Sequence, residues 1–250
     1  GLYTSPHLTD FRERIKVNGK VIPKDFVIDF VNNNKIIFED IKPSFFEMTV
    51  ALAFNYFATK KVDIAVIEVG LGGRLDSTNI IKPDVSVITN IGLDHTELLG
   101  DSIKKIAVEK AGIIKLNTPV VISQKQSEIQ HIFSEFANEL RAPIFFADQI
   151  YNIENQSICE PTHQNVTVRK KGETFSRSLN IDLLGKYQSY NIVGALTTFD
   201  ILNKIGYKIT SSNVLEGLNT IVSRTGLLGR WQIIQNKPLI ICDTGHNYDG

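Results

Sequence analysis

The pattern of apolar and polar residues predicts strands and helices in alternation over the first 150 residues. Apolar runs over 62–70 and 84–92 are rich in β-branched residues and lack clean alternation, which is typical of strands buried on both faces of a parallel sheet. Helical periodicity predicts a short helix over 23–34, a long buried helix over 42–61, and further helices over 101–115 and 127–141. Further strands are expected over 118–123 and 142–148. The alternation with short connections predicts an open α/β sheet.

The pattern changes from about Tyr151 onward. Residues 164–184 predict a hairpin that turns at Lys171–Gly172. An amphipathic helix is expected over 190–206, with Gly206 where a helix C-cap belongs and with one apolar face made of Ile192, Ala195, Leu196, Phe199 and Leu202. A helix with a serine N-cap over 211–222 and strands over 230–235 and 238–247 complete the prediction. The predicted fold is α/β, a mostly parallel sheet flanked by helices and followed by a smaller part that contains the hairpin.

Composition narrows the possible partners. Lys+Arg and Asp+Glu number 27 each, so bulk charge predicts neither a nucleic-acid partner nor a membrane-surface partner. No apolar run reaches the roughly 18–20 residues of a membrane span. Cys159 and Cys242 are predicted to be buried thiols in a reducing compartment, without a disulfide. Because the chain begins at a glycine and stops after a predicted strand, we expect both ends to be internal to a longer protein.

The glycine-rich segment "GLGGRLDST" (70–78) follows the first predicted buried strand. It lacks the lysine of G-x-x-x-x-G-K-[ST], and its spacing differs from G-x-G-x-x-G. A tight turn is therefore favoured over a phosphate-binding loop. Glu68 stands at the carboxyl end of the strand, where open α/β sheets place ligand chemistry. The alternative is that Glu68 is an ordinary solvated acid at a strand end.

The second predicted strand also ends in polar residues, Asn90, Asp94, His95 and Thr96. If the two strands are neighbours, Glu68 and His95 could share one metal ion, and water and substrate phosphates would complete the sphere, as is usual for Mg²⁺. Histidine is an unusual ligand for Mg²⁺. Lys110 falls within an apolar helical stripe, so it must reach solvent, pair with an acid such as Glu109, or change its chemistry.

Several segments together resemble the folylpolyglutamate synthase/dihydrofolate synthase branch of the Mur-ligase-like ATP-dependent amide ligases. The matching pieces run in the family's order over nearly the whole chain: "YTSPHL" with "ERI", "SFFEMTVALAF", "IEVGLGGRLDSTN", "TNIGLDHTELLG", "IAVEKAGIIK", "LLGKYQSYNIVGA", "GRWQ" and "DTGHN". "TSPHL" and "GLGGRLDSTN" favour the folate branch over the peptidoglycan ligases.

The resemblance implies a role for individual residues. Glu68 and His95, with Ser5, would bind catalytic Mg²⁺, and K⁺ is a second candidate ion. Lys110 would be the lysine that family members carbamylate. ATP would be contacted by Asn191, Arg230, Asp243 and His246. The folate or pterin edge of the site would be formed by Ser5, Pro6, His7, Asp76, Ser77, Thr78 and Asn79.

The resemblance also implies that the chain is partial. The family's P-loop, similar to G-T-N-G-K-G-S, is expected before Gly1, and "DTGHN" (243–247) departs from the usual D-G-A-H-N. Residues 1–228 would form the central ATP-binding domain without its P-loop segment. Residues 229–250 would begin a truncated C-terminal Rossmann-like domain that binds glutamate. We expect that this fragment alone does not turn over.

The implied reaction is the ATP-dependent addition of L-glutamate to dihydropteroate, to the glutamyl tail of a folate, or to both, through an acyl phosphate. A peptidoglycan-type Mur ligase and a non-catalytic nucleotide-binding module are the alternatives. The expected partners are small molecules, with no nucleic acid and no membrane. We expect a cytoplasmic monomer.

Overall fold

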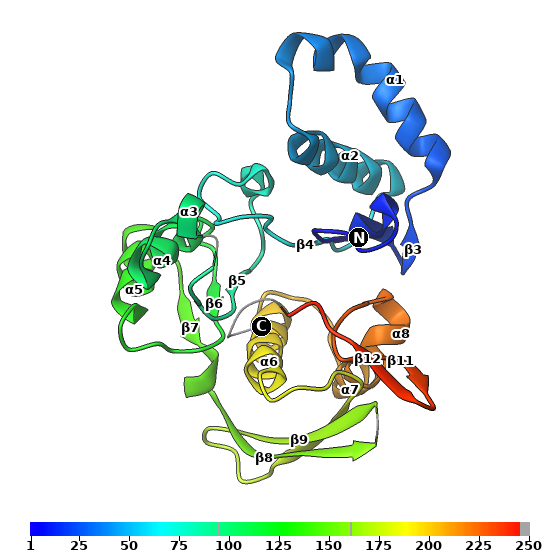
Figure 1. The fold of residues 1–250 in the computed structure, drawn as a ribbon. Helices are drawn as coiled ribbons and strands as arrows, with labels where there is room; N and C mark the ends of the chain where they lie inside the picture. The colour runs from blue at the N-terminus through cyan, green and yellow to red at the C-terminus, as the bar shows by residue number, and fades with distance from the viewer. Residues whose placement is uncertain (95, 161, 246–250) are drawn as a thin grey trace. The chain divides into compact units, whose positions relative to one another are not determined.

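A computed structural model describes residues 1–94, 96–160 and 162–245. The chain divides into two compact units, Gly1–Ile81 and Lys82–Gly250. Figure 1 shows the path of the chain through both.

The first unit contains a four-stranded sheet in the order β3-β2-β1-β4. Its strands are β1 (Leu2–Tyr3), β2 (Ile15–Val17), β3 (Lys20–Val21) and β4 (Val66–Ile67). β1 is parallel to β4 and antiparallel to β2. The same unit contains the 3-10 helices η1 (Phe11–Arg14) and η2 (Ser77–Ile80) and the helices α1 (Lys24–Ile41) and α2 (Phe45–Lys60).

The two long helices form where the pattern predicts them. α2 begins at a capping box, in which Glu47 N donates to Ser44 Oγ at 3.2 Å and Ser44 N donates to Glu47 Oε2 at 2.6 Å. Its buried residues pack with Tyr3, Ile15 and Ile22. α1 continues well past the predicted end in the asparagine run, because Asn34 Nδ2 donates to the carbonyl of Phe30 at 2.8 Å and Phe38 contacts the Phe30 ring.

The second unit is built on a parallel sheet of β5 (Ser86–Ile88), β6 (Val120–Ile122) and β7 (Ile144–Phe146). α4 (Ile103–Ala111) and α5 (Gln130–Glu139) share a buried cluster with Ile88, Val120 and Ile122. Val121 points the other way, into a cluster with α6 (Gln188–Lys204). These clusters give three layers, helices on both faces of a parallel sheet, as expected (Figure 1). α3 (Thr96–Leu99) and η3 (Ala147–Gln149) are short connecting helices.

A second sheet packs on α6. It contains β8 (Tyr151–Glu160), β9 (His163–Lys170) and β10 (Arg177–Ile181), all antiparallel. β9 and β10 form the predicted hairpin, and Gly172 lies in its turn with φ +88°. β8 is an additional strand that the sequence pattern did not predict. Its register shifts between Ile153 and Asn155, and this irregularity breaks the alternation by which strands are recognised.

The last elements are α7 (Ser211–Asn219), α8 (Ile221–Thr225), β11 (Gln232–Asn236) and β12 (Leu239–Cys242). β11 and β12 pair antiparallel. The predicted serine N-cap of α7 was wrong: Thr210 is the cap, since its Oγ1 accepts from Asn213 N at 3.2 Å.

The prediction of buried thiols was also wrong. Cys159 and Cys242 are both free and exposed. Cys159 lies near the end of β8, where residues 157–160 are exposed. Cys242 is the last residue of the exposed strand β12. In the part of the chain that the structure describes, no helix is both long enough and apolar enough to cross a membrane.

Candidate functional site

Glu68 and Ser5 meet at the end of two parallel strands. β1 and β4 run side by side, and Glu68 N donates to Tyr3 O at 3.0 Å just past the end of β4. Ser5 N then donates to Glu68 Oε2 at 2.8 Å. The pairing of β1 with β4 therefore brings together two residues that lie 63 positions apart in the sequence.

The glycine-rich loop donates hydrogen bonds to the carboxylate of Asp76, which is part of the same loop. Asp76 Oδ2 accepts from Leu71 N at 2.9 Å, and its Oδ1 accepts from Thr78 N at 2.9 Å and Thr78 Oγ1 at 2.5 Å. Gly70 lies so close to Phe46 that a Cβ atom there would meet the ring at 2.3 Å. The glycines therefore permit a tight turn against α2, as the sequence indicated, and backbone donors of the loop bind Asp76.

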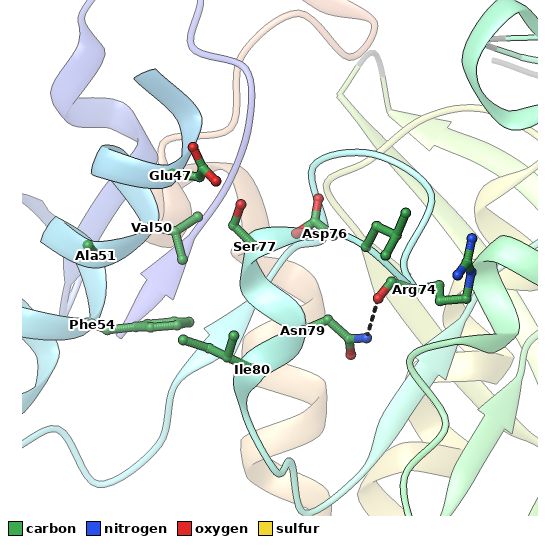
Figure 2. Close-up of a pocket in the computed structure, with 10 residues that line it drawn as sticks. Glu47, Val50, Ala51, Phe54, Arg74, Asp76, Ser77, Asn79 and Ile80 are labelled. Carbon is green, nitrogen blue, oxygen red and sulfur yellow. Dashed lines mark hydrogen bonds between the residues drawn. The ribbon is translucent and has the colours of Figure 1, made fainter. Parts of the chain in front are cut away.

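A groove lies between α2 and the segment that follows the glycines (Figure 2). Its volume is about 440 Å³. Glu47, Val50, Ala51 and Phe54 line the α2 side, and Arg74, Leu75, Asp76, Ser77, Asn79 and Ile80 line the other. Asn79 Nδ2 donates to Arg74 O at 3.1 Å, which fixes the far wall. The groove thus combines two carboxylates with apolar walls.

The α2 side of this groove was missed by the sequence reasoning. Glu47 has the sequence position typical of a capping box. That structural role explained the residue, so no ligand-binding role was predicted for it. Phe54 was expected to belong to a mostly buried helix. No sequence signal distinguishes this side, since Ala51 is exposed whereas Ala53 on the same helix is fully buried.

Lys110 lies in the last turn of α4, beside the buried residues Ile106, Ala107 and Ile114. Its side chain is half-buried. Burial lowers the pKa of Lys110 below its usual value, and the negative charge of Asp94 partly opposes this shift. The predicted position on an inward-facing stripe is confirmed, and Asp94 is the acid that acts on the amine.

Three other residues were predicted at this strand end, and one of them, Thr96, is exposed at the start of α3. Asn90 is exposed just past β5, whereas His95 lies outside the described residues. β4 pairs with β1 and β5 pairs with β6, so the two strands expected to be neighbours belong to different sheets. Within residues 1–94, 96–160 and 162–245, no group of three or more His, Cys, Asp or Glu side chains could hold a metal ion.

Arg230 and Asp243 form one corner at the start and end of the β11–β12 hairpin. Asp243 Oδ1 accepts from Gly245 N and Oδ2 from Trp231 N, both at 2.7 Å. These bonds, together with the charge of Arg230, lower the pKa of the Asp243 carboxyl. Arg230 Nη1 donates to Thr244 Oγ1.

The other two predicted ATP residues are separate from this corner in the sequence. Asn191 is exposed in the first turn of α6, where its Nδ2 donates to Gln188 Oε1 at 3.1 Å. His246 lies outside the described residues.

Comparison with known proteins defines the class. The sequence profile of the Mur ligase middle domain matches residues 30–199, and the chain belongs to this family. Its relatives within the family are folylpolyglutamate and dihydrofolate synthases, which confirms the resemblance to the folate branch. The dihydrofolate synthase/folylpolyglutamate synthase of Bacillus subtilis is 34% identical over 257 residues, which cover 100% of this chain and 59% of that protein.

Solved structures agree with the sequence comparison. An FPGS–AMPPCP–folate complex superposes with a TM-score of 0.90 at 32% identity, covering 100% of this chain and 61% of that one. Escherichia coli FolC in complex with DHPP and ADP gives a TM-score of 0.84 at 29% identity, with 99% and 55% covered. The chain therefore spans a little over half the length of these relatives.

Proposed function

We propose that the protein containing this chain is an ATP-dependent ligase that adds L-glutamate to dihydropteroate, to the glutamyl tail of folates, or to both. The observation that carries the proposal is the similarity over the entire chain to a folylpolyglutamate synthase solved with both an ATP analogue and folate. In the proposed reaction a substrate carboxylate takes the γ-phosphoryl group of ATP, and the glutamate amine then displaces phosphate from the acyl phosphate. Both steps bring anions together, so positive charge must be placed between them.

ATP is assigned to the second unit. Arg230 would bind phosphate oxygens, since a guanidinium is well suited to phosphate geometry. Asp243 would contact ATP as well, and it holds the backbone at Trp231 and at Gly245 through the hydrogen bonds that it accepts. Asn191 would offer its side-chain amide, and His246 is included through the family resemblance alone.

Mg²⁺ fits the chemistry of the Ser5–Glu68 corner. A carboxylate and a hydroxyl-bearing residue lie within one hydrogen bond of each other, and hard oxygen ligands are those that Mg²⁺ prefers. In this proposal Glu68, Ser5 and His95 would hold the ion, and K⁺ is the second candidate. When bound, Mg²⁺ would neutralise charge on the transferring phosphoryl group.

Lys110 is the proposed site of carbamylation. A lowered pKa leaves more of the amine neutral near neutral pH, and only the neutral amine attacks CO₂. The attack forms a C–N bond and releases one proton from the nitrogen. The product is a carbamate anion, which supplies an oxygen ligand in place of the amine.

The groove beside α2 is assigned to the ring end of the folate or pterin substrate. Phe54 and Ile80 offer apolar surface to a flat ring, and the carboxylates of Glu47 and Asp76 can accept from its N–H groups. Ser5, Pro6 and His7 are assigned to the neighbouring edge, with Ser77, Thr78 and Asn79.

The proposal includes the layout of the longer protein. Residues 1–228 would belong to the central ATP-binding domain and residues 229–250 to the start of a glutamate-binding domain. A cytoplasmic location, with the monomer as the default state, is also part of the proposal.

The test is a ligase assay on the full-length protein, with labelled glutamate, ATP and either dihydropteroate or tetrahydrofolate. Incorporation that depends on ATP with at least one acceptor supports the proposal, and the acceptor identifies the branch. Incorporation only with an amino-sugar nucleotide acceptor indicates a peptidoglycan-type ligase. ATP binding without incorporation into any acceptor indicates a non-catalytic module.

The groove assignment has its own variant. Ala51→Trp fills the groove and is expected to raise the KM for the pteridine substrate at least about tenfold, with the KM for ATP unchanged. Ala58→Trp, on an exposed position two turns later on the same helix, is the matched control. Equal KM values for the two variants would remove the groove from the proposal.

A further inference from the structure

The "ERI" motif has no role in the proposed function so far. The short helix η1 directly follows the loop that runs from Ser5 to Asp10, and Glu13 and Arg14 are its last two residues. Both side chains turn back onto this loop and bind different parts of it.

The carboxylate of Glu13 binds the second half of the loop, residues 8–10. Its Oε1 accepts from Asp10 N at 2.8 Å and from Thr9 N at 3.2 Å, and its Oε2 accepts from Leu8 N at 3.0 Å. The Thr9 hydroxyl donates to Oε1 as well. One carboxylate thus satisfies the donors of three consecutive residues, which leaves this part of the loop little freedom.

The side chain of Arg14 binds His7 in the first half of the loop. Its Nε donates to His7 Nδ1 at 3.0 Å, and its guanidinium lies 5.5 Å from the centre of the Phe45 ring on α2. The ring of His7 also meets Phe11 edge to face, with centroids 6.2 Å apart. Arginine has N–H donors only, so His7 Nδ1 must be the acceptor. A neutral His7 ring then carries its proton on Nε2.

The His7 ring lies on the same loop as Ser5. Thr4 N donates to Arg14 O at 3.0 Å, and Ser5 N donates to Glu68 Oε2 at 2.8 Å. The same arginine therefore binds the loop through its backbone before Ser5 and through its side chain after it. His7 keeps part of its surface exposed.

From this geometry we infer that Arg14 is a positioning residue that holds His7 with Nε2–H as a hydrogen-bond donor to an anionic oxygen of a substrate. The inference rests on the proposed function, since the anion is either the carboxylate of the folate-type substrate or a phosphate of ATP. These two sources share one chemistry, an oxygen that accepts a hydrogen bond, and separate KM measurements distinguish them.

The kinetic test uses the full-length protein with Arg14→Gln and its matched control Arg12→Gln. Arg12 lies on the same short helix and pairs with Asp10, with Nη2 and Oδ2 2.6 Å apart. Arg14→Gln is expected to raise the KM of one substrate roughly tenfold, the size of a lost hydrogen bond to a charged group. The affected substrate identifies the anion. Equal kinetics of the Arg14 and Arg12 variants would overturn the inference.

Two substitutions of His7 test which nitrogen acts. Glutamine places its amide donor near the position of Nε2, and asparagine places it near Nδ1. His7→Asn is expected to raise the same KM roughly tenfold, and His7→Gln is expected to raise it clearly less. The reverse order would overturn the assignment of the donor.

A measurement that needs no turnover separates this inference from the proposed function. In the full-length protein with ¹⁵N-labelled histidine at a pH of about 8, where imidazole is neutral, His7 is expected to give the nitrogen shifts of the Nε2–H tautomer. Arg14→Gln should produce a mixture of tautomers, and Arg12→Gln should not. A wild-type His7 with its proton on Nδ1 would overturn the inference even in an active ligase. The Nε2–H pattern in a protein without ligase activity would refute the proposed function and the substrate assigned to His7, and it would leave the positioning of the ring by Arg14 in place.

Discussion

At the scale of single residues, the chemistry depends on how each charged group is surrounded. Lys110 is half-buried beside apolar side chains, whereas Lys105 on the same helix is exposed and pairs with Asp101 at 3.0 Å. As residue types, the two lysines have the same chemistry. Burial lowers the pKa of Lys110, whereas Lys105 has an acid partner at the surface.

Replacement of Lys110 by glutamine in the full-length protein is expected to lower kcat about 100-fold or more, because an oxygen ligand to the reaction centre is lost. The signal of a carbamate in ¹³C-bicarbonate NMR should disappear in the same variant. Lys105→Gln should keep both the rate and the signal. An active wild-type enzyme that shows no carbamate signal at saturating bicarbonate would contradict the assignment.

Glu13 gives a prediction with a definite pH range. Its hydrogen bonds, that of the Thr9 hydroxyl first, lower its pKa from 4.5 to about 2 in the folded protein. A lowered pKa means that the stabilisation is fully present above pH 4.5 and is lost as the pH falls towards 2.

Glu13→Gln should therefore lower the free energy of unfolding by about 1–2 kcal/mol at neutral pH. The difference from wild type should shrink as the pH falls through this range, measured by urea unfolding of the full-length protein. Glu39→Gln, an exposed acid 3.9 Å from Lys35 on α1, should show no such trend. A difference for Glu13→Gln that does not change with pH would exclude the ionised carboxylate as its cause.

At the scale of elements, α6 combines tight packing with an exposed polar end. Gly194 faces Ser123, which follows β6, so closely that a Cβ atom would lie 2.1 Å from Ser123 Oγ. At Gly194 the helix thus approaches the carboxyl end of the parallel sheet with no space for a side chain. Asn191, three residues earlier, stays exposed.

Gly194→Ala is expected to destabilise the protein by about 1–3 kcal/mol, because an added methyl group must displace its neighbours. Gly217→Ala on α7 is the control, since nothing lies within 4 Å of its Cβ position. That substitution should stabilise by about 0.5–1 kcal/mol through helix propensity. Thermal or urea unfolding of the two variants checks both signs, and a stable Gly194→Ala would show that α6 can move away from Ser123.

At the scale of the whole molecule, the proposed ligands are distributed over distant parts of the sequence. Glu68 and Ser5 belong to the first unit, and Lys110, Asn191, Arg230 and Asp243 belong to the second. Binding of a nucleotide with its metal should stabilise the folded full-length protein, because a ligand that binds only the native state shifts the unfolding equilibrium.

AMPPCP with Mg²⁺ at about 100 times its Kd is expected to stabilise by about 2.7 kcal/mol, seen as a rise of a few degrees in Tm. EDTA should remove most of this rise, and added Mg²⁺ should restore it. An equal rise in EDTA would exclude a metal from nucleotide binding. No rise under either condition would contradict ATP as a substrate.

Much of this protein is determined by its sequence alone. Periodicity predicted the α/β class, the order of the longer helices and of the strands from α2 to β12 except β8, and the inward position of Lys110, because these depend on local spacing. It did not predict the short helices η2, α3 and η3, or the division of one expected helix into α7 and α8. The glycine pattern excluded the known phosphate-loop spacings, and the structure shows the expected tight turn. Contiguous motifs indicated the folate branch, which the comparisons confirmed.

Only the tertiary structure decided which distant residues meet. The pairing of β1 with β4 places Ser5 on Glu68, and the packing of Phe46 on Gly70 brings α2 next to the segment that lines the groove. The exposure of the two cysteines likewise depends on neighbours that spacing does not specify. Such contacts come from strand pairing and side-chain packing over long sequence separations, and no local pattern encodes them.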